Sequence, residues 1–337
     1  MIIYLRNYQQ VDLNNNKEIQ MNSFNTMTDD ELNNLYEFLP HLNDNNIELL
    51  YHYTNINGLE GILKYNQFWV SHAHFLNDKT EINYTLNLSN EAFEEYCGNL
   101  SEEECWIFSN EGNKEKQDKE EIIVHLRDLY NVVVNDVFHQ PRYRIYALSF
   151  CINSDSNLLW SNYSNNDGYS IQINYPKFKN YLKEKFKYKD FVHSGYVIYD
   201  KKVQKKLIEH LLKTLLGIVR NLLRPNLELE KVLLSVYSIL SQYSIFFKDE
   251  CFSQEEEFRI AMVFEENFDD YSCRISNGAF IPYIGVYFEK DCVEGITVGP
   301  KNNMDITING LKHFLKLNKY NDIQDEKILK SRIPYRY

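Results

Sequence analysis

The residues best suited to chemistry form an acidic triplet, Glu255, Glu256 and Glu257, followed by Phe258 and Arg259. Glu255 and Glu257 are two positions apart, so an extended backbone places both carboxylates on one face. Two neighbouring carboxylates can divide roles, one with a raised pKa and one ionised. A carboxylate can also stabilise a developing oxocarbenium ion, as in glycosyl transfer. The competing interpretation is a solvated acidic start of a strand, with Arg259 as an ion-pair partner.

A histidine is the second candidate. Residues 50–54 are predicted to form a short strand, with His52 and Thr54 on one face and Tyr51 and Tyr53 on the other. Histidine and threonine side chains can hydrogen-bond to sugar hydroxyls. The alternative is a core histidine that donates to a backbone carbonyl, which the strand by itself favours.

Two aromatic residues follow the predicted strand 144–151, which carries Ser149. Trp160 and Tyr163 are three positions apart and would share one face of a helical turn over residues 158–163. They could form an aromatic wall that stacks on a flat ring, or they could belong to the core. Gly168 is expected to make the turn into the next strand.

Metal and cysteine chemistry have weaker signals. His72 and His74 lie two apart and could share a metal ion, but no third ligand is identifiable, so no metal is expected. The six cysteines include no Cys-x-x-Cys pair and are interpreted as mostly buried free thiols. The chain has neither a Walker-type phosphate loop nor a Gly-x-Gly-x-x-Gly motif.

Charge and hydropathy limit the partners. With 36 basic and 48 acidic residues among 337, the net charge is −12, which argues against nonspecific coating of nucleic acid but allows a local basic groove. The apolar runs are too short to span a bilayer, and the start lacks a signal-peptide pattern. We therefore expect a cytoplasmic protein with no membrane partner.

The elements that must position these residues are strands and helices in mixed order, among them a strong strand predicted over residues 258–264 and a closing helix predicted over residues 306–317. This order predicts an α+β fold with mixed, mainly antiparallel sheets and flanking helices. Residues 1–47 are predicted to be a polar leader with one helix over 29–38, and residues 48–317 a single domain. Two helices over 201–247, broken at Arg224-Pro225, are predicted as an insertion, and residues 318–337 as a C-terminal tail.

Several short blocks, taken in order, resemble the bacterial domain of unknown function 2971 family over about residues 48–316. These blocks are residues 50–54 with Leu59, Ile62 and Leu63, residues 75–78 with Glu81, Leu148-Ser149, residues 159–163 with Gly168, then Phe252, Glu255, Glu257 and Arg259, and residues 298–300. Phe252 stands where the family is expected to carry Trp. The family leaves the reaction open.

A second resemblance, to ADP-ribosyltransferases and in particular to DarT-like toxins, implies a reaction. The Tyr-His-x-Thr strand, the Leu-rich helix after it and the late Glu-x-Glu carry it. It implies that His52 holds the ribose of NAD, that Tyr163 or Trp160 stacks on nicotinamide, and that Glu257 or Glu255 stabilises the ribose cation. The predicted catalytic residues are Glu257, Glu255 and His52, and the predicted cofactor-binding residues are His52, Thr54, Tyr53, Trp160, Tyr163, Ser149 and Arg259. Arg142, Arg144 and Arg259 are candidates for the pyrophosphate.

The sequence thus predicts an NAD-dependent ADP-ribosyltransferase, with NAD as substrate, no metal, and a protein or nucleic acid as the acceptor. Such an enzyme could be a toxin or a phage-defence effector. One alternative is a non-catalytic nucleotide-binding or protein-interaction module of the same fold. Another is a hydrolase or nuclease that uses the glutamate cluster with a divalent metal.

Overall fold

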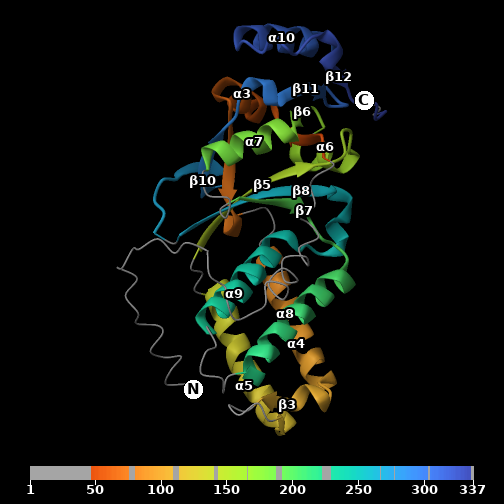
Figure 1. Ribbon diagram of the computed structural model, residues 1–337. Helices are drawn as coiled ribbons and strands as arrows, with labels where there is room; N and C mark the ends of the chain where they lie inside the picture. Colours follow the sequence, from red (N-terminus) through yellow and green to blue (C-terminus); the bar gives the residue numbers. More distant parts are fainter. Residues whose placement is uncertain are drawn as a thin grey trace.

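The computed structural model describes residues 47–75, 80–108, 114–139, 143–164, 166–186, 192–221, 229–265, 267–276, 278–302 and 304–334. The helix expected at 29–38 lies outside these residues. Within them the chain is α+β, with a mostly antiparallel sheet and flanking helices (Figure 1), so this part of the sequence prediction is confirmed.

A ten-stranded sheet occupies the middle of the described structure. Its strands run in the order β12-β11-β6-β1-β5-β2-β10-β9, and β8 pairs with both β5 and β7. Strand β5 therefore has three neighbours, with β8 along its whole length, β2 at its middle and β1 at its end. The strands are β1 (Leu49–Thr54), β2 (Gln67–His72), β5 (Tyr143–Cys151), β6 (Tyr169–Asn174), β7 (Val192–Tyr196), β8 (Glu257–Glu265), β9 (Ser272–Ser276), β10 (Ala279–Tyr287), β11 (Val293–Val298) and β12 (Ile328–Lys330).

The two faces of the sheet pack against different helices. Because cross-strand partners project to the same face, the register identifies which side chains share a side. One face, which carries Phe150 and Phe258, packs in one core with α3 (Ile56–Tyr65) and α7 (Tyr175–Lys185), and we call it the α7 face. The other carries Ala147 and Ala261, which pack against the end of α9 (Leu229–Phe246), and we call it the α9 face.

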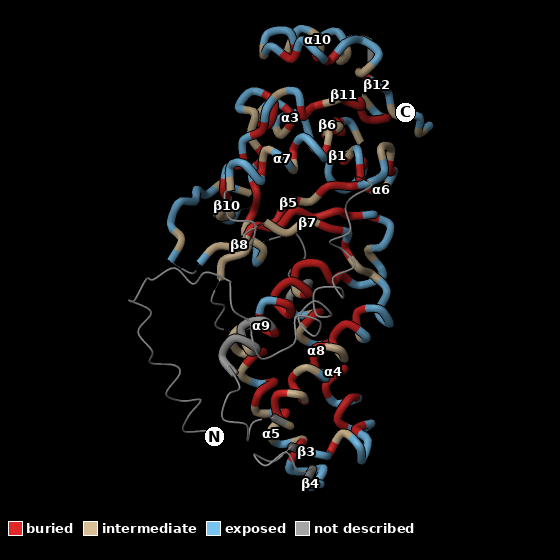
Figure 2. The backbone as a smooth tube through the Cα atoms, in the orientation of Figure 1, coloured by how far each residue is buried: buried red, intermediate tan, exposed pale blue. Residues whose placement is uncertain are grey.

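Four helices form a separate layer on the α9 side, drawn below the sheet in Figure 1. These helices are α4 (Thr80–Asn99), α5 (Lys119–Val134), α8 (Lys201–Asn221) and α9. They enclose their own hydrophobic core, with Leu126, Leu212 and Val236 fully buried, apart from the core of the α7 face (Figure 2). A short hairpin, β3 (Trp106–Phe108) and β4 (Lys114–Lys116), lies at the far end of this layer.

The helical layer comes from two separate stretches of chain. Helices α4 and α5 lie between β2 and β5 in sequence, and α8 and α9 lie between β7 and β8. The two helices expected within 201–247 are present, but they are only half of the layer, because they pack against the earlier pair. Periodicity predicts each helix separately and says nothing of this pairing, since apolar faces do not specify their partner.

Several elements differ from the sequence interpretation. Helix α7 and the strands β3, β4 and β9 had no predicted counterpart, and the segment expected as a tail contributes β12, which pairs parallel to β11. The short helix α6 (Asn157–Ser164) and the late helix α10 (Met304–Leu317) form where the sequence predicts them. Among the described residues, no helix is long and apolar enough to cross a membrane.

Candidate functional site

The carboxylates of Glu255 and Glu257 converge on one lysine. Glu255 ends a short 3₁₀ helix, Glu256 adopts a left-handed conformation with φ of 46°, and Glu257 begins β8. The Nζ of Lys248 lies 2.6 Å from Oε2 of Glu255 and 3.3 Å from Oε2 of Glu257. All three side chains are buried. The left-handed residue between the two glutamates, rather than a continuous strand, brings their carboxylates together.

Arg259 holds Glu257 in a second, bidentate ion pair. Its Nε lies 2.6 Å from Oε1 of Glu257 and its Nη2 lies 2.9 Å from Oε2, while Nη1 donates to the carbonyl of Ile245 at 2.6 Å. Burial alone would raise the pKa of Glu257, but the charges of Arg259 and Lys248 outweigh it and lower the pKa to about 2. Glu257 is therefore ionised at neutral pH. We call Lys248, Glu255, Glu257 and Arg259 the charge cluster.

Two hydroxyls complete the surroundings of Glu257. Ser149 lies opposite Arg259 in the ladder, and a hydrogen bond from its side chain contributes to the lowered pKa of Glu257. The hydroxyl of Tyr199 accepts from the backbone N–H of Glu257 at 3.2 Å. Of the predicted residues, the structure thus brings together Ser149, Glu257 and Arg259.

Tyr163 reaches the charge cluster through Glu255. Its hydroxyl lies 3.4 Å from Oε1 of Glu255, and the tyrosine is 38% exposed while the glutamate is only 8% exposed. The Tyr163–Glu255 pair therefore connects the cluster to the surface. This contact joins two motifs predicted from the sequence, the aromatic pair Trp160 and Tyr163 and the acidic triplet 255–257.

Trp160 does not share this position. It is fully buried, packs edge-on against Tyr53 with 4.8 Å between ring centroids, and donates its indole N–H to Asp155 at 2.7 Å. The hydroxyl of Tyr53 donates to the carbonyl of Asn153 at 2.8 Å and accepts from the N–H of Ser156. Trp160 and Tyr53 therefore hold α6 against the sheet, and the predicted aromatic wall of Trp160 with Tyr163 does not form.

His52 lies on the opposite face of the sheet from Glu257. Tyr51 pairs with Cys151, which pairs with Glu257, so these three side chains project to the α9 face and His52 projects to the α7 face. The His52 ring packs edge-on against Phe68 and Phe150, and its Nδ1 lies 3.2 Å from the carbonyl oxygen of Ser149.

The surroundings of His52 match a core histidine. Burial lowers the pKa of His52, so it is neutral at pH 7. The expected alternation is present, with Tyr51 and Tyr53 on one face, but the structure does not bring His52 and Thr54 together with Glu257. The register of β1 against β5 determines which face His52 occupies, because successive side chains along a strand project to opposite faces.

The predicted arginines separate as well. Arg259 is buried in the ion pair with Glu257, which leaves it unsuited to bind a pyrophosphate from solvent. Arg144 lies toward the other end of β5, where its Nη1 donates to the carbonyl of Phe268 at 2.9 Å, and Arg142 lies outside the described residues.

Sequence reasoning missed Lys248, which connects the two glutamates. Lys248 lies two residues after the end of α9, and the only signal for it is a single cation after the apolar run 245–247. Such a residue usually lies in solvent, and only the tertiary structure places it between two carboxylates. Tyr199 was likewise not predicted.

Other reactive groups give no competing centre. Burial raises the pKa of the Cys151 thiol, which neighbours Glu257 in the ladder, to about 12, so this cysteine is protonated and a poor nucleophile. The described parts of the chain contain no group of three or more His, Cys, Asp or Glu side chains arranged to hold a metal ion.

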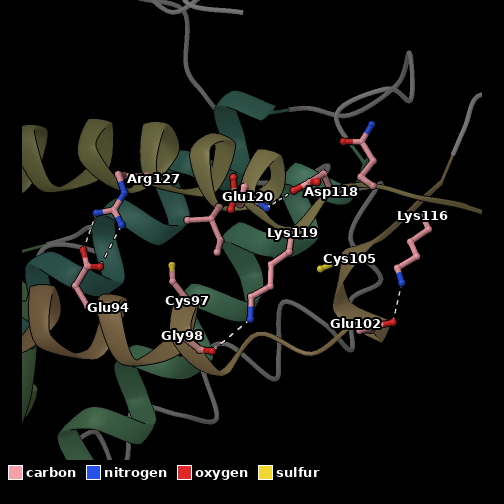
Figure 3. Close-up of a pocket in the computed structure, with 12 residues that line it drawn as sticks. Glu94, Cys97, Gly98, Glu102, Cys105, Lys116, Asp118, Lys119, Glu120 and Arg127 are labelled. Carbon is pink, nitrogen blue, oxygen red and sulfur yellow. Dashed lines mark hydrogen bonds and ion pairs between the residues drawn. The ribbon is translucent and has the colours of Figure 1, made fainter.

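A separate open hollow of about 740 Å³ lies in the helical layer, between the end of α4 and the start of α5 (Figure 3). Several of its ionic side chains bind one another or the backbone. Arg127 pairs with Glu94 at 2.6 Å, Lys116 pairs with Glu102 at 2.7 Å, and Lys119 donates to the carbonyl of Gly98. None of the residues predicted for the site lines this hollow, so we place the candidate site at the charge cluster.

The fold and site define an α+β protein with a buried charge cluster at the start of β8. A family model described as "Protein of unknown function (DUF2971)" matches residues 159–260. This range contains Tyr163 and all of the charge cluster, but neither His52 nor Ser149. The match supports the resemblance to that family. The comparisons with curated proteins and with solved structures give no match.

Proposed function

We propose that the chain catalyses glycosyl transfer from NAD, with Glu255 rather than Glu257 as the carboxylate that faces the reacting ribose. One observation carries this choice. Both oxygens of Glu257 are held by Arg259, whereas Oε1 of Glu255 lies at the hydroxyl of Tyr163, a residue that is 38% exposed. An ADP-ribosyltransferase-like arrangement is part of this proposal.

The chemistry requires a negative charge at one point. Breaking the bond between ribose C1′ and the nicotinamide nitrogen transfers the bonding electrons to nicotinamide and leaves an oxocarbenium ion on the ribose. The Glu255 carboxylate stabilises that cation electrostatically, more strongly in a site that excludes water. A nucleophile on the acceptor then forms the new bond at C1′ and loses its proton. The exposed ring of Tyr163 supplies a surface for the nicotinamide.

The remainder of the charge cluster positions Glu255. Lys248 binds Glu255 and Glu257 at once, and Glu257 is fixed by Arg259, whose third contact is the backbone of α9. Glu255 is therefore anchored to β8 and to the end of α9 together. Such anchoring by neighbouring groups keeps a reactive side chain in one orientation. His52 has no role in this scheme.

The test is nicotinamide release from labelled NAD by the purified protein. Glu255→Gln is expected to lower the rate by about 100-fold or more, because removing one electrostatic contact to a transition state costs that much. The matched control is Glu256→Gln, which alters the exposed neighbour and should keep the wild-type rate. Tyr163→Leu, which removes the aromatic ring, should raise KM for NAD more than it changes kcat. A wild-type protein that releases no nicotinamide, or a fully active Glu255→Gln variant, contradicts the proposal.

A second candidate is a non-catalytic nucleotide-binding or protein-interaction module. The observation that favours it is the balance of the charge cluster, in which two buried acids are offset by two buried bases. Such a set can be purely structural. In that case NAD would raise the melting temperature without being consumed, and Glu255→Gln would leave that shift unchanged. A toxin or phage-defence role, which the DarT-like resemblance implies, belongs to the first candidate only.

A further inference from the structure

The α9 face carries a pair of aromatic rings toward the β9 edge of the sheet. Ser71 pairs with Ala147 and with Tyr283, and Trp69 lies two residues before Ser71, so Trp69 and Tyr283 both project to this face. Their ring centroids lie 4.7 Å apart, and the ring planes are tilted by 31°. Trp69 is 47% exposed. A planar ligand could therefore extend this ring pair from the solvent side, since offset stacking is a favoured arrangement of aromatic rings.

Two polar side chains border the ring pair on the same face. Gly285 lies directly opposite Trp69, and a Cβ there would lie 1.7 Å from Nε2 of Gln67, so the Gln67 amide occupies the space above the glycine. Beyond Trp69 along β2, the Nη2 of Arg274 donates to the hydroxyl of Ser71 at 3.2 Å. The amide and the guanidinium thus lie on either side of Trp69. The residues of this surface, which we call the Trp69 platform, are Trp69, Tyr283, Gln67 and Arg274.

The charge of the Trp69 platform is a single cation. Strands β2, β9 and β10 contain no Asp or Glu, in a chain that has 48 acidic residues. Among the described residues, the guanidinium of Arg274 has the Ser71 hydroxyl as its partner and no carboxylate. A guanidinium has five N–H donors, so several remain for an anionic group. One cation suits one phosphate, whereas a nucleic-acid strand is held by several.

The spacing of ring and cation limits the size of the ligand. Ser71, which binds Arg274, lies two residues along β2 from Trp69, a separation of about 7 Å between Cα atoms. A ribose placed between a base and a phosphate spans a gap of this size. The Gln67 amide adds a donor and an acceptor for the edge of the base. No enclosed cavity is needed, because Trp69 and Gly285 are exposed.

We propose that the Trp69 platform binds a purine mononucleotide, with the base stacked on Trp69 and the phosphate at Arg274. A purine suits the ring pair better than a pyrimidine does, because its larger ring system covers more aromatic surface. A mononucleotide suits the single cation, and the net charge of −12 repels a longer polyanion. This site does not rest on the glycosyl transfer proposed for Glu255.

The test is isothermal titration calorimetry of AMP, adenosine and UMP on the whole chain. AMP should bind about fivefold more tightly than adenosine, the contribution of one exposed charge pair. It should bind about threefold more tightly than UMP, because stacking strength sets the preference among bases. Trp69→Leu should weaken AMP and adenosine alike by about tenfold, the loss of one contact between base and aromatic ring. Arg274→Gln should remove the preference for AMP and leave the affinity for adenosine unchanged.

The matched control is Trp106→Leu. Trp106 lies in the hairpin at the far end of the helical layer and is 37% exposed, so this variant should bind AMP with wild-type affinity. Fluorescence gives a second readout, because the third tryptophan, Trp160, is fully buried. AMP should quench the emission of the wild type and of Trp106→Leu, and it should not quench that of Trp69→Leu.

Four results would each overturn the assignment. They are absence of AMP binding, wild-type AMP affinity in Trp69→Leu, an unchanged preference for AMP over adenosine in Arg274→Gln, and much tighter binding of a single-stranded oligonucleotide than of AMP. Tyr163→Leu should leave AMP binding unchanged, and a loss there would place the nucleotide at the charge cluster instead. Because AMP has no nicotinamide, these outcomes are independent of nicotinamide release, so either proposal can fail while the other stands.

Discussion

At the scale of single residues, Glu257 is a buried carboxylate whose charge is balanced within the protein. Its two oxygens are occupied by Arg259, and Lys248 lies 3.3 Å away. Removing one charge leaves the partner charge buried and uncompensated, which is among the most destabilising changes known in proteins.

Glu257→Gln should therefore lower the free energy of unfolding by about 3 kcal/mol at pH 7. Urea denaturation followed by circular dichroism measures this change. Glu256→Gln, one residue away and exposed, should remain within about 0.5 kcal/mol of the wild type. Equal stability of the two variants would mean that the buried ion pairs contribute nothing net.

The same residue predicts a dependence on pH. The pKa of Glu257 is about 2 in the folded protein against 4.5 for a free glutamate, so the unfolded chain takes up a proton first as pH falls. The contribution of Glu257 is complete above pH 4.5 and is lost between about pH 4.5 and pH 2. Glu257→Gln should lack this part of the acid-induced loss, which a comparison of unfolding free energies at several pH values detects.

His72 titrates in a different window. Its pKa falls from 6.5 to about 4 on folding, so protonation again favours the unfolded chain, and stability decreases as pH drops from about 6.5 to about 4. His72→Gln should lose less stability than the wild type across that range and follow it below pH 4. A parallel decline of the two proteins between pH 6.5 and pH 4 would contradict the assignment to His72.

At the scale of elements, a close crossing of the chain fixes how β6 meets β1 and β11. Gly168 precedes β6, and its carbonyl accepts from the N–H of Gly299, just after β11, at 2.8 Å. A Cβ at Gly168 would lie 2.3 Å from the carbonyl oxygen of Thr54 and 2.6 Å from Cβ of Ser164. Backbone lies on the first side and α6 on the second, so neither neighbour can move independently.

Gly168→Ala should therefore destabilise the protein by about 2 kcal/mol or more, the cost of forcing atoms into a filled space. Gly310→Ala is the matched control. Gly310 lies within α10 with nothing within 4 Å of a built Cβ, so alanine should stabilise that helix by about 0.5–1 kcal/mol. Thermal melting of the two variants should show shifts of opposite sign.

Elements with a strong local pattern were predictable from the sequence. Strand β8 has a continuous apolar stretch, Ile260 to Phe264, and α10 has a clear apolar face, and both form where expected. Helix α7 was missed because its many lysines obscure the helical spacing of its three buried residues, Tyr175, Phe178 and Leu182. Strand β12 was missed because it has only three residues, one of them buried, and is too short to show an alternating hydrophobic pattern.

The candidate site was predictable only in part. The sequence identified Glu255, Glu257 and Tyr163, because reactive residue types at short spacing are visible locally. It could not show that Lys248 joins the two glutamates or that His52 faces the other way. Both facts depend on register and on helix placement, which are set by contacts between distant parts of the chain.

At the scale of the whole molecule, the helical layer and the α7 face have separate hydrophobic cores. Leu212 is fully buried in the helical layer, and Leu212→Ala should cost about 3 kcal/mol. In the Leu212→Ala variant, the amides of α4, α5, α8 and α9 should lose protection from hydrogen exchange, while the amides of β5 and β8 keep theirs. Leu317→Ala, at a position that is 80% exposed, is the control. Equal loss of protection in both regions would mean that the two cores unfold as one unit.

The double insertion of the helical layer also has a consequence during synthesis. Helix α5 ends at Val134 and α9 ends at Phe246, so roughly 110 residues are made after the first helix pair before the second pair is complete. At a synthesis rate of about 5–20 residues per second, the apolar faces of α4 and α5 lack their packing partners, α8 and α9, for roughly 5–20 s. The nascent chain therefore passes through a period in which chaperone binding competes with folding, and its length is set by the position of α8 and α9 in the sequence.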